Sequence, residues 1–273
     1  MKKIEISSQS NKISAIILPD YGGMVARLRI GSKDIFYLNE DLVEVSPILA
    51  GGSPVLFPFS GSIVNDSYEL CGKTYTMPPH GLVKNSCFAA SCADKSHAKL
   101  CASNSETQKD ANYPFDFLLE LDYSISEEGI TLAATMHNKS TAPMPHTFGW
   151  HPYFTATDKS KFSLQLPMHE YIDVNKLIHP SDGHVDAKDP IDSVFYKRTQ
   201  GNVIIQNPAD GYEAVIQMDE AYQVVTVWST PDAFVCVEPW VGVPDAINNG
   251  RYLRCIPAGG KETCAVKIQI KEI

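Results

Sequence analysis

Short apolar or alternating runs, separated by Gly, Pro, Asn and Asp, recur along the whole chain. A period of two is typical of strands that bury one face, and turn residues bound such strands. The pattern therefore predicts strands at Lys12–Leu18, Met24–Ile30, Asp34–Leu38, Pro54–Phe59, Ser67–Leu70, Lys73–Met77, Phe88–Ser91, Lys99–Ala102, Phe115–Ile125, Ile130–His137, Phe162–Leu166, Val203–Gln206, Ala214–Met218, Gln223–Trp228, Phe234–Glu238 and Thr263–Ile270.

The spacing of the turn signals, one in about every 8–12 residues, is typical of a large β-sandwich or barrel. Cys71-Gly72 and Glu127-Glu128-Gly129 predict hairpin turns, and a short helix is expected only near Pro244–Asn248. The loop-rich region Asn175–Thr199 is expected to reach over one face, and Thr107–Pro114 to be an exposed loop. No repeat or linker interrupts the pattern, so we expect one all-β domain over residues 1–273.

Composition narrows the class of protein. The 273 residues carry a formal net charge of -9, which gives no electrostatic footprint for nucleic acid or anionic lipid. No apolar run approaches the roughly 20 residues of a membrane helix, and no apolar segment follows the first lysines as a secretory signal requires. Seven cysteines without a CxxC pair indicate reduced thiols in a cytoplasmic protein. In strands, Cys87, Cys92 and Cys101 are expected to be small buried hydrophobes.

The segment Pro145–Phe154 concentrates histidine and aromatic residues. His151 lies between Trp150 and Pro152, and the proline favours an extended backbone before it. Imidazole has an ordinary pKa of about 6.5, which suits proton transfer near neutral pH. His146 is five positions away, and an odd separation in a strand sends side chains to opposite faces. We therefore expect His146 and His151 not to share a site.

Other candidate groups lie at the ends of predicted strands. Glu238 follows five apolar residues, and a carboxylate at the end of a buried strand needs a partner or a catalytic role. His80 comes just past a predicted hairpin, in Met77-Pro78-Pro79-His80-Gly81. Asp192 lies in the loop-rich region and would most simply be a solvated acid. Trp150, Tyr153 and Trp240 are either core residues or flat platforms for a ligand ring, and we expect Trp240 to be a platform and Trp150 to belong to the core.

Several of these motifs occur in one order. They are Pro54-Val55-Leu56-Phe57-Pro58, Gly72-Lys73-x-Tyr75-x-Met77-Pro78-x-His80-Gly81, Phe148-Gly149-Trp150-His151-Pro152-Tyr153-Phe154, Glu238-Pro239-Trp240 and Pro257-Ala258-Gly259-Gly260. The ordered set resembles the aldose 1-epimerase (galactose mutarotase) family, in particular its less characterised bacterial branch. The resemblance implies a large antiparallel β-supersandwich with an open sugar cleft.

The resemblance also implies interconversion of the α and β anomers of a hexose without cofactor or metal. By motif position it implies His151 and Glu238 as the catalytic acid and base. His80, Asp192, Trp240 and Lys84 are implied as substrate-binding residues, the match at Asp192 being poor. An ionised Glu238 and a protonated His151 would exchange protons with the anomeric hydroxyl and the ring oxygen. The expected partner is a free hexose, and the expected assembly is a monomer or homodimer.

Two positions depart from the family pattern. Ser62 stands where an arginine is usual, and Lys84 replaces a second arginine. Neither side chain reproduces the bidentate fork of arginine, which makes a sugar phosphate a poorer substrate than a neutral sugar. Two alternatives remain. The chain could bind or sense sugars without turnover, or it could be a cupin-like metal enzyme using His80, His146, His151 and Glu238, although its histidines lack His-x-His spacing.

Overall fold

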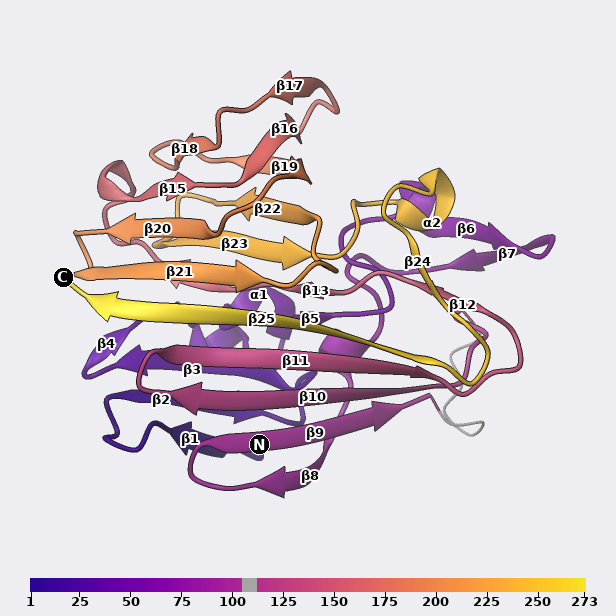
Figure 1. Cartoon of the computed structure of the whole chain (residues 1–273), viewed down its shortest axis with the longest axis horizontal. Helices are drawn as coiled ribbons and strands as arrows, with labels where there is room; N and C mark the ends of the chain where they lie inside the picture. The colour runs from indigo at the N-terminus through magenta and orange to yellow at the C-terminus, as the bar shows by residue number, and fades with distance from the viewer. Residues whose placement is uncertain (105–111) are drawn as a thin grey trace.

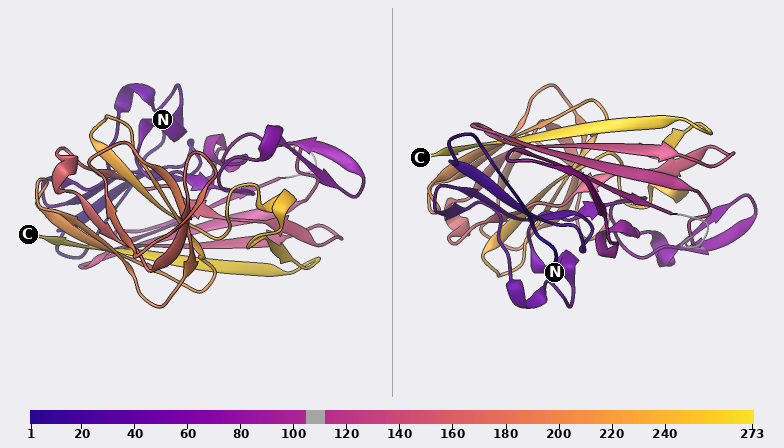
Figure 2. Two further views of the ribbon diagram at one scale, coloured as in Figure 1. Left: turned by 90° about the horizontal axis from the view of Figure 1, so that it is seen from above. Right: turned by 90° about the horizontal axis from the view of Figure 1, so that it is seen from below.

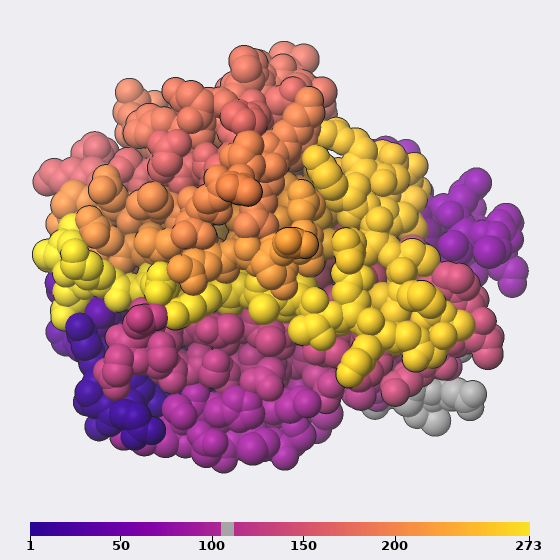
Figure 3. All heavy atoms as spheres, viewed as in Figure 1, coloured from indigo at the N-terminus to yellow at the C-terminus, as the bar shows by residue number. Residues whose placement is uncertain are grey.

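Two large sheets, antiparallel throughout, form the body of the protein, whose computed structural model describes residues 1–104 and 112–273 (Figure 1). The first sheet runs in the order β18 (His184–Asp186), β15 (Ser163–Gln165), β20 (Val203–Asn207), β21 (Tyr212–Met218), β25 (Lys261–Glu272), β11 (Gly129–Asn138), β10 (Phe117–Ser126), β9 (His97–Ser103) and β8 (Ala89–Ala93). In Figure 3 the yellow C-terminal segment crosses this face between orange and magenta segments.

The second sheet carries the candidate site. Its order is β17 (Ile178–Pro180), β16 (Met168–Ile172), β19 (Asp192–Arg198), β22 (Val224–Trp228), β23 (Phe234–Trp240), β13 (Gly149–Trp150) and β5 (Val55–Leu56), with β14 (Tyr153–Thr155) also paired to β23. All seven residues of β23 are buried, so this strand is covered on both faces, as predicted.

Smaller elements complete the architecture. A third sheet contains β1 (Ile4–Ser7), β2 (Ile13–Leu18), β3 (Met24–Ile30) and β4 (Lys33–Asp34), and the two-stranded ladders are β6 (Ser67–Leu70) with β7 (Lys73–Thr76) and β12 (Met144–His146) with β24 (Arg254–Ile256). The helices are α1 (Pro47–Ala50) and α2 (Ala246–Asn249), with 3₁₀ turns at Glu40–Leu42, Val64–Asp66, Val83–Asn85 and Lys159–Lys161. Figure 2 places the indigo N-terminal strands opposite yellow β25. Within the described ranges, every helix is too short or too polar to cross a bilayer.

The core follows the alternation read from the sequence. In β10 and β21, buried residues alternate with partly or fully exposed ones, so each strand turns one face inward. Leu119, Leu121, Ile216 and Ile268 are among the residues that join one continuous apolar cluster between the sheets. The expected all-β class is confirmed by these strands, which use the period-two pattern to bury one face.

The region 175–199 was expected to be mostly loop, and this is wrong. It contains β17, β18 and the seven-residue β19, which is hydrogen-bonded between β16 and β22 in the second sheet. Asp189-Pro190 precedes β19, and only long-range pairing with β22 shows that the strand begins at Asp192. The predicted exposed loop at 107–114 falls largely on residues 105–111, which lie outside the described part of the chain.

The expected burial of three cysteines is also wrong. Cys87 and Cys92 are exposed and Cys101 is partly buried. Cys92 is exposed because it lies in β8, the edge strand of its sheet, which is exposed along its whole length. Cys236 and Cys264 are the buried cysteines among those described, and all the described cysteines are free thiols.

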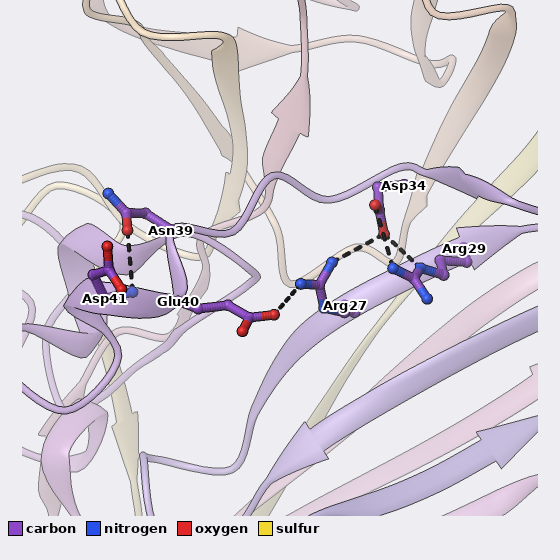
Figure 4. Close-up of polar contacts among 6 residues, drawn as sticks. All are labelled: Arg27, Arg29, Asp34, Asn39, Glu40 and Asp41. Atoms are coloured by element: carbon purple, nitrogen blue, oxygen red, sulfur yellow. Dashed lines mark hydrogen bonds and ion pairs between the residues drawn. The ribbon is translucent and has the colours of Figure 1, made fainter.

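Polar contacts hold the surface of the N-terminal sheet (Figure 4). Asp34 accepts from Arg29 Nε at 2.6 Å and from Arg27 Nη1 at 3.3 Å, and Arg27 also pairs with Glu40. Asn39 caps the following 3₁₀ turn by accepting from the Asp41 N–H at 3.1 Å. Such partly exposed ion pairs contribute about 0–1 kcal/mol each. They set the local geometry of the sheet edge more than its stability.

Candidate active site

The register of β23 brings His151 and Glu238 together. Gly149 pairs with Trp240 and Tyr153 pairs with Cys236, so the residue midway between Gly149 and Tyr153 faces Glu238 across the same ladder. That residue is His151, whose Nε2 lies 3.3 Å from Glu238 Oε2. The imidazole and the carboxyl group are 4% and 1% exposed. The two candidate catalytic residues are therefore adjacent and almost completely buried.

Burial controls the protonation of this pair. It raises the pKa of the Glu238 carboxyl well above its ordinary value, an effect that the Trp240 indole partly offsets and the Asp192 carboxylate reinforces. Burial lowers the pKa of the His151 imidazole well below its ordinary value, and His80 adds to this. Burial therefore shifts the free site towards a protonated Glu238 beside a neutral His151, whereas the expected ring opening uses an ionised Glu238 and a protonated His151. The two charge states differ only in the position of one exchangeable proton, which lies on the Glu238 carboxyl group in one state and on the His151 imidazole in the other.

The pair lies in a cleft of about 910 Å³. All six residues predicted for the site line this cleft: His80, Lys84, His151, Asp192, Glu238 and Trp240. Ser62, which stands at the place of the usual arginine, lines it as well. The volume is within the range of about 300–1,000 Å³ that is usual for small-molecule sites.

His80 lies against the pair because of an unusual backbone. Its φ is +65° and that of Gly81 is +74°, so the chain turns sharply after the β6–β7 hairpin. His80 Nδ1 accepts a hydrogen bond from the Gly61 N–H at 3.3 Å. Its ring centroid is 5.4 Å from that of His151 and 5.9 Å from that of Trp240. His80 therefore forms a wall of the cleft next to the proposed acid–base pair.

Lys84 stabilises the turn that contains His80 and Gly81. Its ammonium group donates to the carbonyls of Pro79 and Gly81, the latter at 3.2 Å. Burial lowers the pKa of Lys84 to about 8. Two of its three N–H donors are thus engaged with backbone, and the remaining one is available to the cleft that Lys84 lines.

The expected core role of Trp150 is confirmed, whereas Trp240 is only 3% exposed and its role as a sugar platform stays a prediction. Trp150 is fully buried and its indole donates to the Ser53 carbonyl at 3.1 Å, which makes it a core residue. Trp240 lines the cleft. Tyr153 stacks on the His151 ring at a centroid distance of 4.8 Å and an interplanar angle of 12°. The Tyr153 hydroxyl donates to the Ile48 carbonyl at 2.6 Å, so the ring that supports His151 is itself held in place.

His146 does not join the site. It is completely buried, and its Nε2 lies 3.3 Å from Oε2 of Glu262, which also pairs with Arg254 at 2.6 Å. The residue is absent from the lining of the cleft. The four-residue metal site of a cupin-like enzyme is therefore not assembled, because His146 is engaged elsewhere.

Asp192, the weakest sequence candidate, lines the cleft. It begins β19 opposite Trp228 of β22, it is exposed, and it lies close enough to Glu238 to act on its pKa. An exposed carboxylate at the edge of a sugar-sized cleft can accept from hydroxyl groups. The local sequence could not reveal this position because the pairing of β19 depends on residues more than thirty positions away.

Sequence reasoning missed several residues that line the cleft: Asp173, Lys176, Thr226, Trp228, Asp245, Asn249 and Arg251. The guanidinium carbon of Arg251 lies 4.5 Å from the ring centroid of Tyr196, a cation–π contact. Arg251 follows α2, whose position near 244–248 was predicted correctly. The sequence does contain a signal for Arg251. It is a cationic residue that directly follows Gly250, the glycine that ends α2, and α2 comes soon after the Glu238-Pro239-Trp240 motif.

The protonation of His80 should be visible in the pH dependence of stability. Burial and the Lys84 ammonium lower the pKa of His80 from 6.5 to about 4. Between these values the unfolded chain binds a proton that the folded chain excludes, so stability falls as the pH falls through this window. The variant His80→Asn should lose less stability over the window, by about 1–2 kcal/mol for this half-buried group. Urea unfolding of both proteins at pH 6.5 and 4.5 measures the difference, and equal losses would contradict it.

The turn after His80 depends on Gly81. A Cβ at this position would lie 2.3 Å from the Phe57 carbonyl oxygen, at a positive φ. Gly81→Ala should destabilise the protein by about 2–3 kcal/mol, because neither the clash nor the φ can relax without moving backbone. Gly72→Ala is the matched control, since Gly72 also has a positive φ but faces open space. Urea midpoints measure the two effects, and equal midpoints would contradict the predicted role of the close approach.

Comparisons with known proteins agree with this architecture. The sequence profile of the aldose 1-epimerase family matches residues 3–263. The plasmid form of the LacX protein of Lactococcus lactis subsp. lactis is 23% identical over 239 residues, covering 76% of this chain and 79% of LacX.

Two solved structures share the fold over nearly their whole length. The Slr1438 protein of Synechocystis sp. PCC 6803 superposes with a TM-score of 0.93 at 23% identity, covering 100% of this chain and 96% of its own. A galactose mutarotase-like protein from Lactobacillus casei ATCC 334 superposes with a TM-score of 0.84 at 19% identity, covering 99% and 100%. The fold is thus the galactose mutarotase-like β-sandwich, and the chain belongs to the aldose 1-epimerase family.

Proposed function

We propose that the protein is an aldose 1-epimerase that interconverts the α and β anomers of a free, neutral hexose without a cofactor. The observation that carries the proposal is the 3.3 Å separation of His151 Nε2 and Glu238 Oε2 within a sugar-sized cleft. Mutarotation requires one group that removes a proton and one that supplies a proton. A carboxyl–imidazole pair that shares one exchangeable proton provides both the proton acceptor and the proton donor.

The proposed reaction moves two protons and breaks one bond. The carboxylate of Glu238 takes the proton of the anomeric hydroxyl, while His151 gives a proton to the ring oxygen O5. The C1–O5 bond opens to an aldehyde, C1 rotates about the C1–C2 bond, and O5 attacks the other face of the carbonyl. During closure Glu238 gives its proton to the carbonyl oxygen and His151 takes a proton back from the O5 hydroxyl, so the protein ends in its initial state.

This route starts from the charge-separated form of the pair, whereas burial favours the neutral form in the free site. We infer that a bound sugar shifts the proton from Glu238 to His151. A hydroxyl that donates to the Glu238 carboxylate, together with the Trp240 indole, favours the ionised carboxylate. The proton then resides on His151, where the ring-opening step uses it.

Neighbouring groups position the sugar in this proposal. His80, beside His151, would hydrogen-bond the oxygen on which negative charge develops. Asp192 would accept from sugar hydroxyls at the cleft edge, and Trp240 would contact the C–H face of the ring. Lys84 holds the His80 turn and can offer one further N–H to a hydroxyl.

The preference for a neutral hexose rests on the cations of the cleft. Ser62 cannot bind a phosphate bidentately, and the Lys84 ammonium is engaged by two backbone carbonyls. Arg251 stacks on Tyr196, and Lys176 is outnumbered in the cleft by Asp173, Asp192 and Asp245, which repel an anion. Saturation by glucose 6-phosphate without activity on any free hexose would contradict this preference.

A second candidate function is sugar binding without turnover. The presence of Ser62 at the position of the usual family arginine favours it, because a lost donor could weaken the transition state more than the ground state.

One experiment separates the two candidates. Pure α-anomers of several hexoses are dissolved with and without the protein, and the approach to the anomeric equilibrium is followed by NMR or polarimetry. Acceleration in proportion to protein concentration supports the epimerase. Saturable sugar binding without acceleration would support the binding protein and overturn our first proposal.

A further inference from the structure

A thiol lies next to the proposed acid–base pair. One donor atom each of His151, Cys236 and Glu238 lies within 4.8 Å of the others, and all three residues are buried. Cys236 and Glu238 are two positions apart in β23, so their side chains share one face of the sheet. Tyr153 faces Cys236 in the ladder, which places His151 beside both residues. The strand register thus brings an imidazole, a thiol and a carboxyl group together.

Two of these groups are incompletely satisfied. Among the described residues, His151 Nδ1 is a buried atom without a hydrogen-bond partner, and Glu238 Oε2 makes no contact of hydrogen-bond geometry, His151 Nε2 being 3.3 Å away. A buried polar atom without a partner costs about 1–3 kcal/mol, so a ligand that engages it gains binding energy. The cleft gives access, because His151 and Glu238 both line it while Cys236 lies behind them at 0% exposure.

The donor set has a definite metal preference. Nitrogen, thiolate and carboxylate donors suit Zn²⁺ and related thiophilic cations, whereas Mg²⁺ and Ca²⁺ prefer sites built from oxygen. Donors in a tetrahedral zinc site are about 3.5 Å apart and the present donors are within 4.8 Å, so the arrangement requires closure by up to about 1.3 Å. A thiolate and a carboxylate together neutralise a divalent cation, which limits the cost of placing its charge in a buried site.

We propose that His151, Cys236 and Glu238 form an inhibitory site for Zn²⁺ or a similar thiophilic divalent cation, with the fourth coordination position directed to the cleft. Binding releases the protons of the thiol and the carboxyl group to solvent and leaves the imidazole neutral. The bound ion occupies the Glu238 carboxylate that the acid–base reaction needs as its base. Metal binding itself follows from the geometry, and only its inhibitory effect rests on the proposed function.

Metal binding can be tested without an activity assay. The exposed and partly buried thiols Cys71, Cys87, Cys92, Cys101 and Cys255 are first replaced by serine, which removes surface binding. Titration of this background protein with Co²⁺ should give a thiolate-to-cobalt charge-transfer band with a stoichiometry of one, and Zn²⁺ should displace it. Absence of the band in a folded background protein would overturn the proposal.

Variants identify the ligands. In the same background, Cys236→Ala should abolish the charge-transfer band. Glu238→Gln should weaken Zn²⁺ binding at least about 10-fold, because the loss of a residue that only hydrogen-bonds to a ligand already weakens metal binding by that factor. Cys264→Ala is the matched control, because Cys264 is equally buried but lies in the other large sheet. Circular dichroism verifies that each variant is folded. A band that survives Cys236→Ala, or is lost in Cys264→Ala, would contradict the assignment.

Inhibition is measured separately. In the background protein, Zn²⁺ should stop anomer exchange at one equivalent, and a chelator should restore the rate. Stoichiometric binding with full activity would overturn the inhibitory role while leaving the site intact. If the metal-free protein shows no epimerase activity at all, the proposed function fails, and the spectroscopic test of the metal site still stands.

Discussion

Replacing Glu238 by glutamine should slow anomer exchange at least about 100-fold, the usual scale of general acid–base catalysis. The amide has the shape of the carboxyl group but cannot take the proton of the anomeric hydroxyl. It can still donate and accept hydrogen bonds in a buried position that is 1% exposed, so the fold should survive. NMR exchange rates at saturating sugar measure the effect on the chemical step, and sugar binding should change much less.

The matched control is Glu262→Gln. Like Glu238, Glu262 is an acid paired with a histidine, here His146, but it is only partly buried and lies outside the cleft. This variant should keep its exchange rate within a few-fold, whatever it loses in stability. A near-normal rate in Glu238→Gln, or an equal loss in both variants, would remove Glu238 from the proposed catalytic pair.

His151→Ala should produce a loss of similar size, again at least about 100-fold. The change removes the proton donor to the ring oxygen and leaves Glu238 without the group 3.3 Å away. His146→Ala is the control, because His146 is buried to the same degree and is engaged with Glu262. Exchange rates are compared after each variant has been verified by its thermal transition.

The double variant adds a sharper test. Groups that act as one unit lose their joint contribution when either is removed, so the losses are not additive. His151→Ala combined with Glu238→Gln should therefore be little slower than either single variant. A product of the two separate losses would indicate independent roles and would contradict the shared proton.

The sequence was sufficient for the parts of the fold that depend on local pattern. The alternation in Phe117–Ser126 and Tyr212–Met218 marks strands that bury one face, and both strands are present. The continuous apolar run before Glu238 predicted a strand covered on both faces. The sequence was insufficient for β19, because polar and apolar residues mix there without a clear period. This strand forms because β16 and β22 hydrogen-bond to it on both sides.

The same division holds for the site. Motif order pointed to His151, Glu238 and His80, whose chemistry is recognisable from residue type. The charge state of the pair was not predictable, because it depends on how completely the fold removes water from both groups. The proximity of Cys236 was not predicted either, although its separation of two residues from Glu238 in a strand was visible.

The position of β25 has a consequence for how the chain is made. This strand joins β21 to β11 in the middle of the largest sheet, yet residues 261–272 follow every other strand of that sheet in the sequence. During synthesis, the edges of β11 and β21 that pair with β25 stay without that partner until residues 261–272 have been synthesised. Assembly of the sheet is therefore a late event with large sequence separations, and chaperones that shield strand edges should bind the nascent protein until then.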